Sequence, residues 1–135
     1  MKATLQYQGN AMIVLLALQY ILGLAVMAFV KFPESATVAQ YWDFANSQWL
    51  LVTHMAVGTG LVIGAVVILV RAILQKNTIW KIAGSIGFIS IIIAGLGGER
   101  FVSTQSDVWS LVMGIGFLAA FLSYGWTLYV SKPVV

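Results

Sequence analysis

Four long runs of apolar residues, separated by shorter polar segments, divide the chain. They span residues 11–30, 49–70, 79–98 and 108–130. Each run has the roughly 20 residues that a helix needs to cross the hydrocarbon core of a bilayer. The pattern therefore predicts an all-α integral membrane protein, an up-down-up-down bundle of four transmembrane helices. No linker or change of composition divides the chain, so we expect one membrane domain over residues 1–135.

The segments between the runs indicate where the helices begin and end. Residues 31–48 form the longest polar connection, and their aromatic side chains predict a short segment lying at the level of the lipid headgroups. Asn77 or Thr78 can cap the third helix, and Ser106 or Asp107 can cap the fourth. Aromatic residues near the run ends are expected to anchor the helices at the membrane interface. They are Trp42, Trp49, Trp80, Trp109, Trp126 and Tyr129.

Composition supports a membrane location. The 135 residues are 61% hydrophobic and 8% charged, whereas soluble domains carry roughly 25% charged residues. The net charge of +3 comes from dispersed basic residues, which form no basic stripe of the kind that binds nucleic acid. Cysteine is absent, and this excludes disulfides, thiolate metal sites and cysteine nucleophiles.

The distribution of basic residues predicts the orientation. Five of the seven lie in the N-terminal segment, the connection after the second run and the C-terminal segment: Lys2, Arg71, Lys76, Lys81 and Lys132. Positive charge concentrates on the cytoplasmic side of membrane proteins. We therefore expect a multi-pass protein of the cell membrane with both termini in the cytoplasm.

Small residues recur at spacings that bring helices together in lipid. The pairs are Gly60 with Gly64, Ala83 with Gly87, Ala94 with Gly98, and Gly114 with Gly116. One interpretation is close packing of helices. The other is room for a flat cofactor between helices, because glycine lets a ligand approach the backbone.

His54 is the only histidine of the chain, and it lies five residues beyond Trp49. At a rise of 1.5 Å per residue, it should lie about 7–8 Å below the outer boundary of the membrane. An ionisable side chain at that depth needs a partner within the protein. We weigh two interpretations: a neutral histidine bonded to another helix, and an axial haem ligand between helices of the bundle.

Three further residues are candidates for the same site. Met113 lies five residues beyond Val108, so it should match the depth of His54 and could be the sixth iron ligand; its alternative role is to fill the core. Arg100 could hold a haem propionate or simply end its helix in solvent. Gln19 should form an interhelical hydrogen bond, worth about 0.6–2 kcal/mol, or hold a quinone or a propionate.

Two short sequences resemble a known family. The segment LQYILG at residues 18–23 and the segment THMAVGTGL at residues 53–61 resemble one half of haem A synthase, a four-helix haem-binding unit. The resemblance implies that His54 is a haem ligand. The family's second ligand would fall near residues 112–113, where no histidine stands. The resemblance thus implies a haem-b-binding relative, or a protein of the same fold that has lost its cofactor, rather than haem A synthesis.

These features lead to two functional hypotheses. The first is a small b-type cytochrome-like protein that binds haem b for electron transfer or haem handling in a respiratory membrane. The second is a cofactor-free accessory subunit of a larger membrane complex or homo-oligomer. A solute channel is disfavoured because the helices carry few polar residues. The sequence has no nucleophile–base pair or phosphate-binding loop, so nothing indicates hydrolysis or phosphoryl transfer.

Overall fold

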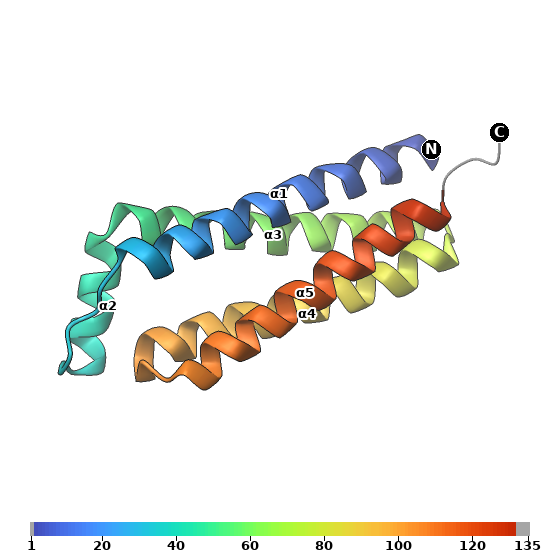
Figure 1. Ribbon diagram of the computed structural model, residues 1–135. Helices are drawn as coiled ribbons and strands as arrows, with labels where there is room; N and C mark the ends of the chain where they lie inside the picture. Colours follow the sequence, from blue (N-terminus) through green and yellow to red (C-terminus); the bar gives the residue numbers. More distant parts are fainter. Residues whose placement is uncertain (1, 132–135) are drawn as a thin grey trace.

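The computed structural model describes residues 2–131, and its regular secondary structure in that range is helical throughout (Figure 1). Lys132, one of the residues behind the predicted orientation, lies outside this range. Four of the five helices are long and apolar enough to cross a membrane, by length and composition. The helices are α1 (Lys2–Phe29), α2 (Val38–Ser47), α3 (Trp49–Leu74), α4 (Thr78–Thr104) and α5 (Asp107–Val130).

The first transmembrane helix starts earlier than predicted. The polar lead before residue 11 was expected outside the helix, but α1 begins at Lys2. Leu5 is fully buried, and Gly9 packs against the ring of Trp80 on α4. These contacts explain the difference, because helices in proteins are held mainly by tertiary packing rather than by local propensity.

The third transmembrane helix continues beyond its predicted end at residue 98 and reaches Thr104. Val102, in the added turn, is 5% exposed and belongs to a small apolar cluster with residues of α2 and α3. Gln105 then ends the helix in the left-handed conformation, with a φ of 53°. At the other end, Asn77 is the N-cap, and its side chain accepts a hydrogen bond from Trp80 N.

The connection predicted to lie at the headgroups contains a helix of its own, α2. A capping box starts it: Thr37 Oγ1 accepts from Gln40 N, and Gln40 Oε1 accepts from Thr37 N at 2.8 Å. Trp42 Nε1 donates to Ser103 Oγ on α4 at 3.2 Å. Helix α2 was not predicted, because its ten residues are too few and too polar to form an apolar run. In Figure 1, α2 lies across the ends of the long helices.

The long helices contact one another in a ring: α1 with α3, α3 with α4, α4 with α5, and α5 with α1. Within α1 and α3, Met12 meets Gly64 while Gly23 meets His54, so the two helices run in opposite directions. The same holds for α4 and α5, which lie side by side in Figure 1. Helices α3 and α5 occupy opposite corners of the ring, since they share almost no contacts.

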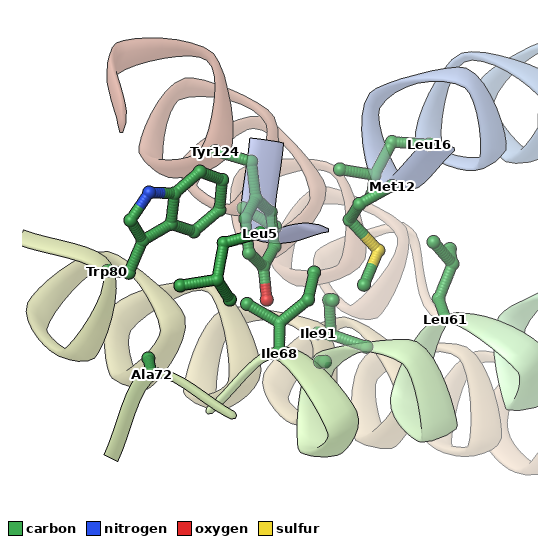
Figure 2. Close-up of a cluster of buried hydrophobic side chains, with 11 residues drawn as sticks. Leu5, Met12, Leu16, Leu61, Ile68, Ala72, Trp80, Ile91 and Tyr124 are labelled. Atoms are coloured by element: carbon green, nitrogen blue, oxygen red, sulfur yellow. The ribbon is translucent and has the colours of Figure 1, made fainter. Parts of the chain in front are cut away.

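The main core lies between all four long helices (Figure 2). Its largest side chains are Trp80 and Tyr124, each 1% exposed or less. The prediction of Trp80 as an interface anchor is therefore wrong. Gly9 explains why: a Cβ at that position would lie 3.1 Å from Cζ3 of the indole, so the missing side chain leaves room for the ring.

The outer faces of the long helices are apolar and uncovered. In the most apolar stretch of each helix, between 11% and 33% of the residues are buried. Side chains such as Ile63, Ile89 and Leu122 are more than half exposed. In water such a surface would associate or aggregate. The four helices therefore fit a multi-pass membrane protein, with lipid against these faces.

The predicted close packing of small residues is confirmed at some glycines and wrong at others. Ser90 O lies 2.7 Å from the place where a Cβ on Gly116 would stand, and Tyr124 covers Gly87. The sulfur of Met113 rests on Gly98. Nothing lies within 4 Å of a Cβ on Gly60 or Gly114, because these two glycines point away from the neighbouring helices.

Tyr124 gives a first testable prediction. Its hydroxyl is fully buried and has no hydrogen-bond partner among the described residues. An unpaired buried polar group costs about 1–3 kcal/mol. We expect Tyr124→Phe to keep or raise the free energy of unfolding in detergent or lipid, whereas Tyr129→Phe, at an exposed position, should leave it unchanged. A clear loss of stability in Tyr124→Phe would mean that the hydroxyl is bonded, for instance to a buried water.

Candidate functional site

The centre of the candidate site is a polar contact between α1 and α3. Gln19 Nε2 lies 3.1 Å from His54 Nε2. Each polar residue has a glycine one turn later on its own helix, Gly23 after Gln19 and Gly58 after His54. The helices run in opposite directions, so each polar side chain meets the other helix's glycine. A Cβ on Gly23 would lie 3.3 Å from His54 Cε1, and a Cβ on Gly58 would lie 3.3 Å from Gln19 Nε2.

The contact leaves two polar atoms without partners. His54 Nδ1 and Gln19 Oε1 are both buried, and neither has a hydrogen-bond partner among the described residues. Burying a polar group without a hydrogen bond is costly in an apolar environment. A ligand that bonds to either atom would recover that free energy. The arrangement therefore combines one nitrogen that is held in place with a second nitrogen that has no partner.

The other two candidate residues lie elsewhere. Met113, on α5, contacts Gly98 of α4 through its sulfur, and α5 is diagonal to the helix that carries His54. Arg100 Nε lies 3.7 Å from Glu99 Oε2, and both side chains are largely exposed, at 60% and 49%. The structure thus brings Gln19 to His54 and does not bring Met113 or Arg100 to them.

Among the described residues, the contact between Gln19 and His54 coincides with no cluster of metal-ligating side chains and with neither of two apolar surface hollows. In residues 2–131, no three histidine, cysteine or acidic side chains group together in a way that could hold a metal ion. One apolar hollow lies between α4 and α5, and another lies where the end of α1 meets the start of α3. Neither is lined by His54 or Gln19.

The sequence contains a pattern that indicates this pairing. Gln19 with Gly23, and His54 with Gly58, are both polar–glycine pairs at i and i+4, and such residues share a helix face. On adjacent antiparallel helices, the polar residue of each pair can pack against the glycine of the other pair. The pattern therefore indicates which polar residues meet.

Comparisons of the chain with protein-family models, with curated proteins and with solved structures gave no match.

Proposed function

We propose that this chain is a multi-pass protein of the cell membrane, with four helices crossing in up-down-up-down order and both termini in the cytoplasm. Uncovered apolar faces on the four long helices support the membrane location. The excess of basic residues near the termini and between α3 and α4 supports the orientation.

Within that membrane domain, we propose a b-type haem site in which His54 ligates the iron. The observation that carries the proposal is the state of the imidazole: one ring nitrogen is held by Gln19, and the other is buried without a partner. In a metal-ligating histidine the second ring nitrogen donates its N–H to an outer acceptor, and Gln19 Oε1, which has no partner among the described residues, could be that acceptor if the amide turned. Gly23 lies against the imidazole, and Gly58 lies against the amide of Gln19.

Each of the candidate residues would have its own role in such a site. His54 would hold the iron, and the iron would supply one-electron chemistry suited to electron transfer or haem handling. Gln19 would orient the imidazole. Met113 as sixth ligand, and Arg100 as the partner of a propionate, would each have to leave its present contact with Gly98 or Glu99. Those two assignments are separate parts of the proposal.

A second candidate function rests on a different observation at the same place. The hydrogen bond between Gln19 and His54, with a glycine against each residue, is also what a polar contact between helices requires. In that case the chain is a cofactor-free accessory subunit of a larger membrane complex, and His54 holds α1 against α3.

The visible spectrum of the purified protein distinguishes the two functions. Wild-type protein from haem-replete cells should show a Soret band, and His54→Ala should lose or shift it. Met113→Leu should change the band only if the sulfur ligates the iron, and Met27→Leu, at an exposed position, is the matched control. A colourless but folded wild-type protein, or a Soret band that His54→Ala leaves unchanged, would overturn the haem proposal. The colourless result would support the accessory subunit.

A further inference from the structure

The chemistry of the two groups fixes the protonation of the imidazole. The side-chain nitrogen of glutamine is a donor only, and it is this nitrogen of Gln19 that lies 3.1 Å from His54 Nε2. In this orientation of the amide, His54 Nε2 accepts the hydrogen bond. A neutral imidazole that accepts at Nε2 carries its proton at Nδ1. In this state neither ring nitrogen has a free lone pair: one is bonded to the amide, and the other is protonated.

We propose that Gln19 is a positioning residue whose amide selects the tautomer of His54, and thereby decides whether the imidazole can ligate a metal. With the amide nitrogen toward the ring, the proton is at Nδ1 and the ring is closed to a ligand. A half-turn of the amide presents Oε1 instead, which accepts from a protonated Nε2. The single ring proton is then carried by Nε2 instead of Nδ1, and the lone pair of Nδ1 becomes available.

The surroundings allow that turn. Gln19 Oε1 has no partner among the described residues, so turning the amide breaks no other hydrogen bond. A Cβ on Gly23 would lie 3.9 Å from His54 Nδ1, so Gly23 is the neighbour of this nitrogen on α1. The histidine is therefore held at Nε2, while Nδ1 is buried without a partner among the described residues. Only the identity of the ligand rests on the proposed haem function, since the tautomer belongs to the cofactor-free protein.

The single histidine makes the proposal directly measurable. Nitrogen-15 labelling of histidine gives signals from one imidazole, and protonated and unprotonated ring nitrogens have separate chemical shifts. In cofactor-free wild-type protein in lipid, at mildly alkaline pH, we expect a proton on Nδ1 and none on Nε2. Gln19→Met keeps the length of the side chain without the amide, and the single tautomer should be lost.

Gln19→Glu sharpens the test, because an ionised carboxylate only accepts hydrogen bonds. At a pH where the infrared carboxylate band shows the new side chain to be ionised, Nε2 should carry a proton, the reverse of wild type. Gln8→Met is the matched control: it removes an amide from the same face of α1, three turns earlier, and should leave the imidazole signals unchanged.

Two results would overturn the proposal: wild-type protein with its proton on Nε2, or a Gln19→Met variant that keeps the wild-type tautomer. Both results are measured on protein without haem. A protein that binds no haem but shows the expected tautomers would remove the haem function and keep the role of Gln19. A protein that binds haem at His54 but whose tautomer does not depend on Gln19 would keep the haem function and remove the role of Gln19.

Discussion

Replacing Gly116 or Gly97 with alanine is expected to destabilise the interface between α4 and α5 by about 1–3 kcal/mol, the usual effect of overpacking. A Cβ on Gly116 would lie 2.7 Å from Ser90 O and 2.9 Å from Ala94 N. A Cβ on Gly97 would lie 2.9 Å from Met113 N. These are backbone atoms, so no side chain can turn aside, and the helices would have to move apart. Close backbone contact is a main source of helix association in lipid.

Each of these variants has a matched control two residues away on the same helix. A Cβ on Gly114 or on Gly95 would meet nothing within 4 Å, so Gly114→Ala and Gly95→Ala should not lose stability. Unfolding by a denaturing detergent in mixed micelles, followed by circular dichroism, would measure the free energy of all four variants. If Gly116→Ala and Gly114→Ala unfolded alike, the close approach of α4 and α5 at this point would be wrong.

These pairs show what the sequence could and could not predict about packing. The spacing of small residues predicted close contacts between helices without saying which helices meet, and such contacts occur between α4 and α5 at Gly97 and Gly116. It did not distinguish Gly114 from Gly116, because both are equally small. Residues two apart differ by about 200° around a helix, so only the rotation of α5 within the bundle decides which one faces α4. That rotation depends on contacts along the whole helix, including the burial of Tyr124.

The existence of the long helices was predictable, since bilayer thickness sets the length of an apolar run. Their ends were not, because the helices continue past the apolar runs wherever packing holds them. Leu5 and Val102 lie in such extensions, and both are buried. The helix α2 escaped prediction for a related reason: its capping box at Thr37 and its contact with Ser103 stabilise it, and neither produces an apolar run.

The candidate site was predictable in part. Counting residues from the helix ends gives the depth of a side chain in the membrane but not its direction. His54 and Met113 were assigned the same depth, yet their helices lie at opposite corners of the ring, and the sulfur of Met113 rests on Gly98. The partner of His54 is instead Gln19, the polar residue of the adjacent helix whose glycine spacing matches its own.

Replacing Trp80 with alanine is expected to have the largest effect on stability, up to about 3–5 kcal/mol. The indole is 1% exposed and belongs to the same buried cluster as Leu5 and Tyr124 (Figure 2). Its removal would leave a cavity against Gly9, where no side chain is present to fill the space. In lipid the loss comes from packing rather than from transfer out of water, so the value is an upper bound.

Trp126→Ala is the matched control, because that ring is 66% exposed and its removal leaves lipid or headgroups in its place. The same detergent unfolding measurement should show a large loss for Trp80→Ala and a small one for Trp126→Ala. The sequence alone assigned both tryptophans to the membrane interface, which predicts similar and small effects. Equal losses would therefore contradict the buried position of Trp80, and with it the close packing of α1 on α4 at Gly9. A large difference would show that a tryptophan at the end of an apolar run can belong to the core when the facing helix provides a glycine.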